Sequence, residues 1–301
     1  MVVGIFGTTA SGKSALAQAL ARRLPCEVVN VDSMQVYAGA ATLTNQPTRA
    51  ERAAVPHHLV GYRALTEASS VGAHTPLAHA AIDDVAGRGA VPLVVGGTGL
   101  YLRAALTDLA LPPAVAPERR AHWERTYDEL GGAAALSVLA GRDPRAAARL
   151  HANDRRRVVR AFELAEMGVS LAPEQDRLWG AGKRRPAIVA VVSWPRDDVR
   201  ARIGERTAAM LAGGAVDEVR ALRARGQPPS PTAARIIGLA QIGAYLEGRA
   251  TLAEAAAEIT LRTAQYARRQ ETWARRIPGA IELPGADGPE RNADRLLELI
   301  R

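Results

Sequence analysis

The chain opens on an apolar run followed by a glycine-bounded loop, Val2-Val3-Gly4-Ile5-Phe6-Gly7-Thr8-Thr9-Ala10-Ser11-Gly12-Lys13-Ser14. Val2–Phe6 has the composition of a buried strand, and Ser14–Arg23 carries apolar residues at helical spacing. The loop between them fits the phosphate-binding pattern GxxxxGK[ST], in the strand-to-helix setting that this pattern requires. The stretch therefore predicts a P-loop that binds a polyphosphate.

The loop offers a phosphate three kinds of group. Gly7 and Gly12 let backbone N–H groups turn inward, and the dipole of the following helix adds positive potential. Lys13 places a charge on the terminal phosphates, and the hydroxyl of Ser14 is a ligand for Mg²⁺. We therefore expect Mg²⁺ as a cofactor, with Ser14 as its protein ligand.

The strand-and-turn pattern recurs along the first third of the chain. Cys26–Val31 and Val91–Val95 read as buried strands, and an alanine-rich helix is expected between them. Such alternation is typical of a doubly wound parallel sheet, in which ligands bind at the C-terminal ends of the strands. Gly7, Asp32 and Gly96 would all lie at that edge.

The middle of the chain follows a different pattern. From Pro117 to about Gly168 only helical blocks occur, and Ala187–Val192 then returns the chain to the sheet. The sequence thus predicts an α/β fold of the P-loop NTPase-like kind with an all-helical insertion. The core would comprise residues 1–112 and 183–301, and the insertion residues 113–182.

A long helix is predicted near the C-terminus, over Thr251–Arg276. One stripe along it follows the helical repeat. The stripe comprises Leu252, Ala256, Ile259, Thr263, Tyr266, Gln270 and Trp273.

Composition narrows the classes of protein to consider. No run of eighteen or more apolar residues exists, so no membrane partner is expected. The one cysteine, Cys26, excludes an intrachain disulfide and fits a reducing cytoplasm. The net charge of +8 favours a polyanionic partner.

The third predicted strand ends differently from that of a typical nucleotide hydrolase or kinase. Those enzymes usually carry a strand-ending aspartate for Mg²⁺. Here the strand is followed by Gly96-Gly97-Thr98, and the only acid at a strand end is Asp32. This departure points to chemistry other than phosphoryl transfer.

An ordered set of motifs resembles the tRNA dimethylallyltransferase family, from residue 3 to about residue 276. Besides the loop, the set comprises Asp32–Tyr37, Pro56–Leu59, Gly96–Leu102, His151–Val158, Arg202 and Arg206 before Met210, and Gln265–Trp273. Departures from the family pattern occur at Thr8, Gln46, Gly61 and Leu239, and they leave the phosphate cradle and Asp32 intact.

The resemblance implies transfer of a dimethylallyl group from dimethylallyl diphosphate to N6 of the adenosine adjacent to the tRNA anticodon, with release of diphosphate. The catalytic residues would be Asp32 as acceptor of the N6 proton, Thr98 near the bridging oxygen, and Arg206 at the leaving group. The diphosphate would bind Gly7, Thr8, Thr9, Ala10, Ser11, Gly12, Lys13 and Ser14. Other roles remain open: a helix cap or Mg²⁺ ligand for Asp32, a helix cap for Thr98, and a solvated helix face for Arg206.

The same resemblance assigns a tRNA surface for the anticodon stem-loop. Between Arg142 and Arg160 stand seven arginines and two acids, a charge run that could equally be a solvated helical face. The residues assigned to tRNA in the insertion are Arg120, Arg156, Arg157, Val158, Val159 and Arg160. Those around the target base are Asp32, Ser33, Met34, Gln35 and Thr98.

Two other functions are compatible with the loop. One is a P-loop kinase that phosphorylates a small-molecule acceptor, and the other is an RNA-binding P-loop protein without catalysis. The preferred interpretation is the prenyltransferase, acting as a monomer.

Overall fold

The computed structural model describes residues 1–109, 111–113, 115–172 and 182–300. It divides into two compact units. The first comprises Met1–Asp108 and Gly182–Arg301, and the second comprises Leu109–Ala181. The second unit corresponds to the insertion that we predicted over residues 113–182.

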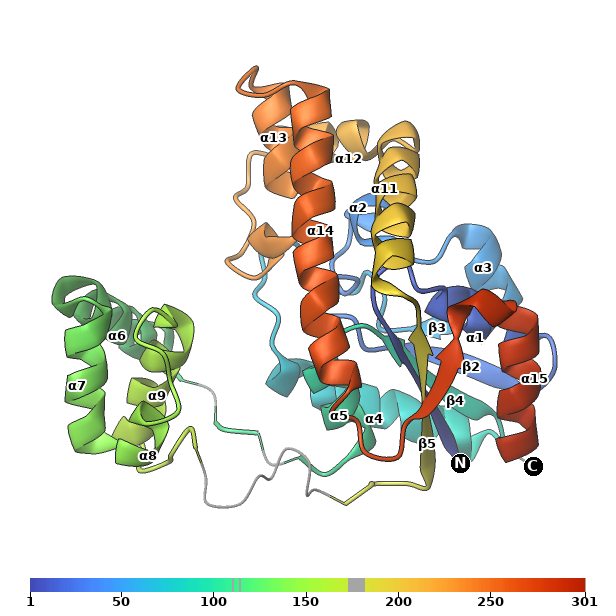
Figure 1. The fold of residues 1–301 in the computed structure, drawn as a ribbon, viewed down its shortest axis with the longest axis horizontal. Coiled ribbons are helices and arrows are strands. Elements are labelled where there is room, and N and C mark those ends of the chain that lie inside the picture. Colours follow the sequence, from blue (N-terminus) through green and yellow to red (C-terminus); the bar gives the residue numbers. More distant parts are fainter. Residues whose placement is uncertain (110, 114, 173–181, 301) are drawn as a thin grey trace. The chain divides into compact units, whose positions relative to one another are not determined.

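Within the described residues, one six-stranded sheet forms the centre of the first unit (Figure 1). Its strand order is β3-β2-β4-β1-β5-β6, and every neighbouring pair is parallel. The strands are β1 (Val2–Gly7), β2 (Cys26–Asn30), β3 (His57–His58), β4 (Val91–Gly96), β5 (Ala187–Ser193) and β6 (Ile281–Pro284). The predicted α/β class with a parallel sheet is confirmed, whereas β3 is too short to have left a sequence pattern.

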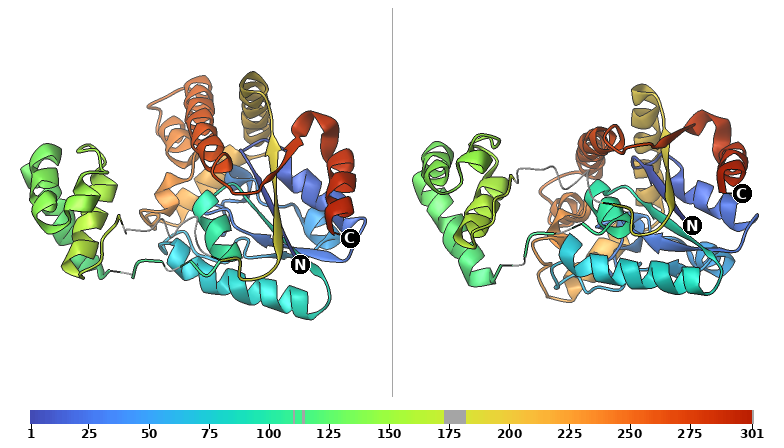
Figure 2. Two further views of the ribbon diagram at one scale, coloured as in Figure 1. Left: turned by 60° about the horizontal axis from the view of Figure 1, so that its bottom comes forward. Right: turned by 90° about the horizontal axis from the view of Figure 1, so that it is seen from below.

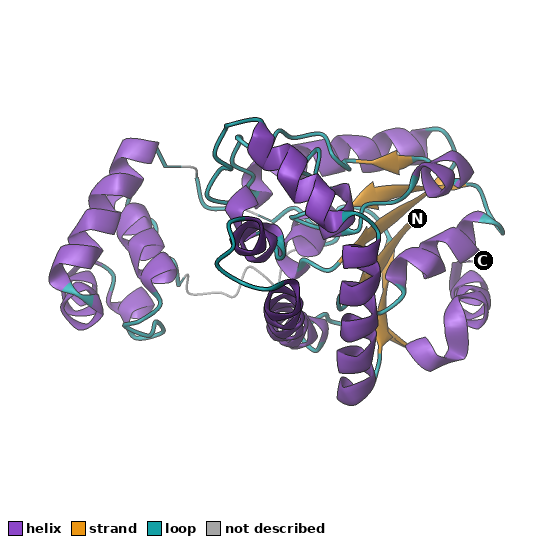
Figure 3. Cartoon of the chain, turned by 90° about the horizontal axis from the view of Figure 1, so that it is seen from above, coloured by secondary structure: helices purple, strands orange, loops and turns teal. Residues whose placement is uncertain are grey.

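The central strand β1 explains why the apolar run at the N-terminus is unbroken. Val3 and Ile5 pack in the core on one face of the sheet, and Val2 and Phe6 pack in the core on the other. Helices cover both faces (Figure 2, Figure 3), so neither side of the strand can be polar. The turns after β1, β2 and β4 meet at the C-terminal edge of this sheet, as predicted.

The helices of the first unit surround the sheet. They are α1 (Lys13–Ala21), α2 (Ala41–Thr44), α3 (Arg49–Ala54), α4 (Val71–Gly87), α5 (Gly99–Leu106), α11 (Arg196–Ala212), α12 (Ala215–Ala224), α13 (Leu239–Leu246), α14 (Leu252–Ala274) and α15 (Gly288–Ile300). The predicted stripe on α14 is wrong at its start, because Leu252 is 38% exposed and the buried face begins at Ala255. Among the described residues, no helix is both long and apolar enough to cross a membrane.

The second unit is helical throughout its described residues, as predicted. Its helices are α6 (Pro117–Leu130), α7 (Gly132–Arg142), α8 (Pro144–Ala147) and α9 (Arg155–Glu166). Trp123 of α6 stacks on Phe162 of α9 at the centre of a separate apolar core, with ring centroids 4.7 Å apart. The second unit therefore has a hydrophobic core of its own, separate from the cores on the sheet.

Candidate active site

The loop between β1 and α1 has the backbone that its glycines and small residues predict. Gly12 takes φ +93°, and Ala10 takes φ 61°, both in the left-handed region. At Gly7 a Cβ would stand 2.4 Å from the Ser11 hydroxyl oxygen, so only glycine fits. Ser11 Oγ is buried without a hydrogen-bond partner among the described residues. A buried polar atom of this kind needs a ligand or water oxygen to complete its hydrogen bonds.

Side chains behind the loop hold its carbonyl groups outward. The Trp194 indole N–H donates to the Ser11 carbonyl at 2.9 Å, and Arg202 Nε donates to the Ala10 carbonyl at 2.8 Å. The Arg202 guanidinium lies over the Trp194 ring, 4.2 Å from its centroid. In a trans peptide the C=O and the following N–H point in opposite directions, so anchoring the Ser11 carbonyl directs the Gly12 N–H away from Trp194.

The first turn of α1 completes an anion cradle. Among the described residues, the amides of Lys13, Ser14 and Ala15 have no backbone acceptor. Such amides at a helix N-terminus bind anions, aided by the helix dipole. Thr9 differs, because its amide already donates to Gln270 Oε1 at 2.8 Å. The amides on the α1 side of the loop therefore remain for a phosphate.

Two cationic side chains converge on this cradle. Burial lowers the pKa of Lys13 to about 8, although nearby Asp32 raises it; the neighbouring Arg206 lowers it further. Arg206 extends from α11 to donate to Thr9 Oγ1 at 2.6 Å, so its guanidinium lies against the loop and not on a solvated helix face. Burial also lowers the pKa of Arg206, and Asp32 again opposes the change. The two cations thus share one nearby acid.

Asp32 follows β2 at the next strand end. Its backbone N–H donates to Asn30 Oδ1 at 3.0 Å, and its Oδ1 accepts from the Met34 N–H at 2.9 Å. No helix begins at this turn, so the helix-cap role does not apply. Among the described residues, Oδ2 has no hydrogen-bond donor, which leaves it available to accept a proton.

Thr98 joins the turn after β4 to the turn after β2. Its hydroxyl accepts from the Ser33 N–H at 3.1 Å and donates to Ser33 Oγ at 3.2 Å. Thr98 does occupy the N-cap position of α5, but its side chain makes no capping hydrogen bond. The close approach of the two turns requires glycine at position 96, where a Cβ would stand 2.6 Å from the Val31 carbonyl carbon.

The other residues assigned to the target base have structural partners. Gln35 donates from Nε2 to the carbonyls of Thr44 and Asn45, at 3.2 and 2.7 Å. Met34 packs partly buried against the core formed around α12 and α13. Asp32, Ser33 and Thr98 are thus brought together, while Met34 and Gln35 also support the backbone beyond the turn.

Three residues at this site, Gln270, Tyr266 and Trp194, have contacts that the sequence alone did not indicate. Gln270 and Tyr266 lie on the predicted α14 stripe, which marked their face but not their function. The Tyr266 hydroxyl lies 3.4 Å from Thr98 Oγ1, and its pKa is raised by burial and by Asp32. Trp194 carries no sequence signal, because its role depends on where β5 places it beside the loop.

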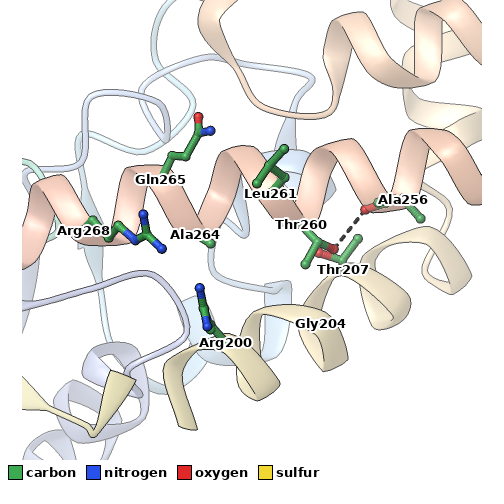
Figure 4. A pocket seen from close by; sticks show the side chains of 10 residues that line it. Arg200, Gly204, Thr207, Ala256, Thr260, Leu261, Ala264, Gln265 and Arg268 are labelled. Carbon is green, nitrogen blue, oxygen red and sulfur yellow. Dashed lines mark hydrogen bonds between the residues drawn. The ribbon is translucent and has the colours of Figure 1, made fainter. Parts of the chain in front are cut away.

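A hollow of about 590 Å³ also lies between α11 and α14 (Figure 4). Arg200 and Arg268 stand at the same end of it, and the wall beyond them is formed by small residues such as Gly204 and Ala264. None of the predicted site residues lines this hollow. It is therefore distinct from the edge where the loop, Asp32 and Thr98 meet.

In the helical unit, two arginines assigned to tRNA are paired. Arg120 Nε and Arg160 contact the two carboxylate oxygens of Glu163, each at 2.8 Å. Glu163 is fully buried, and although burial alone would raise its pKa, the two arginines hold that pKa below its ordinary value. Arg160 also donates to the Pro113 carbonyl at 2.7 Å. These two arginines therefore have a structural role within the unit.

Val158 and Val159 were also assigned to tRNA, and their side chains point into the helical unit. They are 0% and 3% exposed and belong to the core of the helical unit. The basic run alternates with this buried face because α9 is amphipathic, so apolar residues next to the arginines turn inward. Arg157 is different, since its side chain is 69% exposed and lies 3.9 Å from Asp154.

Comparison with known proteins gives a consistent result. A family model described as IPP transferase matches residues 35–277. The chain is 43% identical to a tRNA dimethylallyltransferase of Kineococcus radiotolerans, over 99% of this chain and 96% of that one.

Two solved structures are also similar. A tRNA isopentenylpyrophosphate transferase from Bacillus halodurans aligns with 30% identity and a TM-score of 0.68, over 99% of both chains. A eukaryotic dimethylallyltransferase acting on tRNA aligns with 26% identity and a TM-score of 0.81, over 98% of this chain and 77% of the other.

Proposed function

This chain belongs to the IPP transferase family, and on that premise we propose that it transfers a dimethylallyl group from dimethylallyl diphosphate to tRNA. The acceptor is N6 of the adenosine adjacent to the anticodon, and diphosphate is released. One observation carries the proposal. The two partly buried cations of the phosphate cradle, Lys13 and Arg206, lie near a single carboxylate, Asp32, on the neighbouring strand end.

The leaving-group side of the site is the phosphate cradle. As the C1–O bond of the donor breaks, its electron pair passes to the diphosphate, and negative charge grows on the phosphate oxygens. The amides of Gly12 to Ala15, Lys13 and Arg206 offer hydrogen bonds and positive charge to those oxygens. The hydroxyl of Thr98 would reach the bridging oxygen.

The acceptor side is the Asp32 turn. The N6 lone pair forms the new bond to C1, and the N6 proton passes to Asp32. Met34 fixes one carboxylate oxygen through its backbone N–H, which orients the other oxygen toward the site. The adenosine must leave its stack to reach this edge, as enzymes that modify bases in folded RNA generally require.

Mg²⁺ is the cofactor that this cradle would accept. Among the described residues there is no cluster of three or more His, Cys, Asp or Glu side chains, so no all-protein metal cage is offered. Mg²⁺ commonly uses one or two protein oxygens together with phosphate oxygens and water. The exposed hydroxyl of Ser14, which has no partner among the described residues, fits that role. When bound, the ion would neutralise charge on the diphosphate.

The remaining partners follow from the same site. We propose that the anticodon stem-loop of tRNA contacts the Ser33–Gln35 turn and the exposed arginines of α9, Arg156 and Arg157 among them. We propose that the chain acts as a monomer. The single, buried thiol of Cys26 is compatible with the cytoplasm.

A doubly labelled donor tests the proposal against its rivals. Unmodified tRNA is incubated with enzyme, Mg²⁺ and dimethylallyl diphosphate carrying ¹⁴C in the prenyl group and ³²P in the diphosphate. We expect ¹⁴C on the tRNA and ³²P in free diphosphate. Transfer of ³²P from γ-labelled ATP to an acceptor would instead identify a kinase, and tRNA binding with neither transfer would identify a non-catalytic RNA-binding protein.

A further inference from the structure

The side chain of Gln270 connects the two halves of the site. Its Oε1 accepts from the Thr9 N–H of the phosphate loop at 2.8 Å, and its Nε2 donates to the Gly97 carbonyl of the turn after β4 at 2.9 Å. Gln270 is 2% exposed, and both hydrogen bonds are buried. We call this pair of hydrogen bonds the Gln270 bridge.

The bridge uses both functions of the amide group. A backbone N–H needs an acceptor and a backbone carbonyl needs a donor, and a primary amide supplies both from one planar group. A Cβ at position 97 would stand 2.1 Å from Gln270 Nε2, so the glycine there leaves room for the bridge. The amide of Gln270 on α14 therefore packs closely between the phosphate loop and the turn after β4.

Neighbouring contacts extend the same connection. Thr9, held at its N–H by Gln270, is held at its hydroxyl by Arg206. One turn earlier on α14, Tyr266 approaches Thr98, and one turn later Trp273 packs where a Cβ on Gly99 would stand. Positions 266, 270 and 273 lie on one helix face. This face of α14 therefore contacts the turn that carries Thr98 at three successive levels.

We propose that Gln270 is a positioning residue that sets the separation between the leaving-group cradle and the acceptor side of the site. The inference rests on the proposed function, because the distance matters only if a donor bound at the loop reacts with a nitrogen held at Asp32 and Thr98. Gln270 touches neither reactant. Its loss would misplace the two halves by a fraction of an ångström to an ångström, which lowers the rate of bond formation more than donor binding.

The main test is the Gln270→Leu variant, with Gln18→Leu as matched control. Gln18 also donates from Nε2 to a backbone carbonyl, that of Glu51 on α3, away from the site. At a temperature well below unfolding, we expect Gln270→Leu to lower kcat on the order of 10²-fold, with the KM for donor changed far less. Gln18→Leu should keep the wild-type kcat. A kcat of Gln270→Leu within twofold of the control would overturn the inference.

Gln270→Glu supplies a readout that a purely structural role would not give. A protonated glutamic acid accepts from Thr9 and donates to Gly97 as the amide does, whereas the ionised form has no proton for the Gly97 carbonyl. The ratio of its kcat to that of wild type should therefore rise as pH falls. Lys13, Arg206, Asp32 and Tyr266 face the same space in both proteins, so the ratio removes their common contribution to the pH dependence. A low ratio that does not rise as pH falls contradicts the bridge.

Hydrogen exchange separates this inference from the proposed function. The Thr9 amide should exchange faster in Gln270→Leu than in wild type or Gln18→Leu, whether or not transfer is observed. Inactive wild-type protein would count against the proposed function. Active wild type combined with unchanged exchange at Thr9 in Gln270→Leu would count against the Gln270 bridge alone.

Discussion

The phosphate loop and helix α9 both concentrate positive charge, but they neutralise it differently. At the loop, Lys13 and Arg206 share the nearby Asp32, and burial lowers the pKa of both cations. In the helical unit, Arg120 and Arg160 close on the buried carboxylate of Glu163, each through a 2.8 Å contact. At the loop, two cations lie near one acid and beside backbone amides that have no acceptor. In the helical unit, the two arginines are both bound to Glu163.

The difference shows where positive charge indicates a ligand. A buried lysine with a lowered pKa is held at a cost in free energy that a bound anion would relieve. An arginine paired to a buried acid already has an anionic partner. Removing that arginine would leave a buried carboxylate without a counter-charge, which costs free energy. A count of arginines along the chain cannot distinguish these two states.

The largest effect is expected at the one acid that the two loop cations share. Asp32→Asn should lower transfer by about 10²- to 10⁴-fold, the usual contribution of a general base. Binding of inorganic diphosphate should be kept or strengthened, because a negative charge beside the cradle is removed. Asp198→Asn, an exposed acid on α11, is the control. Near-normal transfer by Asp32→Asn would remove it as the base.

Lys13→Ala tests the excess of positive charge directly. We expect kcat/KM for the donor to fall by about 10²- to 10³-fold, as for loss of one group that stabilises a developing negative charge. Thermal stability should not fall, because desolvation disfavours the charged lysine at this partly buried position. Parallel losses of stability and activity would indicate a structural role for Lys13.

The same lysine predicts a pH dependence. With its pKa lowered to about 8, Lys13 is charged below that pH and loses its proton above it. The kcat/KM for the donor should therefore fall as pH rises through about 8. Lys13→Arg should lack this alkaline decline, since a guanidinium keeps its proton. Persistence of the decline in Lys13→Arg would assign it to another group.

Glu163→Ala tests the paired region. Removing the buried partner of two arginines should destabilise the helical unit by about 1.5–3 kcal/mol, the loss of hydrogen bonds to a charged group, because both arginines left behind are partly exposed to solvent. Asp128→Ala, which breaks an exposed pair with Arg155, should have a much smaller effect, because solvent screens such pairs. Calorimetric unfolding of the full chain measures both. The Glu163 contribution should persist above its ordinary pKa and be lost as pH falls through its lowered value. Equal losses of stability in the two variants would contradict a larger contribution from the buried Glu163 than from the exposed Asp128.

The smallest effect is expected at an exposed arginine of α9. Arg157→Ala should reduce the slope of log affinity for tRNA against log salt concentration by about one, the contribution of one phosphate contact. Arg155→Ala is the comparison, because Arg155 is closed on Asp128 at 2.6 Å and should change the slope less. Binding titrations over a range of ionic strength give both slopes. Identical slopes for all three proteins would remove Arg157 from the tRNA surface.

The features that could be predicted best from the sequence are those set by local backbone geometry. Two such features are the loop from Gly7 to Ser14 and the glycine turn at 96–99. Both depend on glycines at fixed spacing, which can be recognised in the sequence alone. The parallel sheet followed from runs of apolar residues with the same logic.

The pattern of charges did not reveal which arginines are paired. Arg120 and Glu163 lie on different helices, so the sequence of neither segment alone predicts their ion pair. Val158 and Val159 were assigned to tRNA through the family resemblance, and the helical repeat turns their side chains inward. Trp194 and Gln270 reach the loop from distant positions in the chain, and only the fold brings them there.

The most direct test of the central claim is a structure of the protein with an anticodon stem-loop and dimethylallyl thiodiphosphate, a donor analogue that reacts slowly. We expect diphosphate oxygens at the amides of Gly12 to Ala15 and beside Lys13, with the N6 amine of the extruded adenosine within hydrogen-bond distance of Asp32. A nucleoside triphosphate preferred at the loop over the analogue, with Asp32 turned away from the RNA, would contradict it.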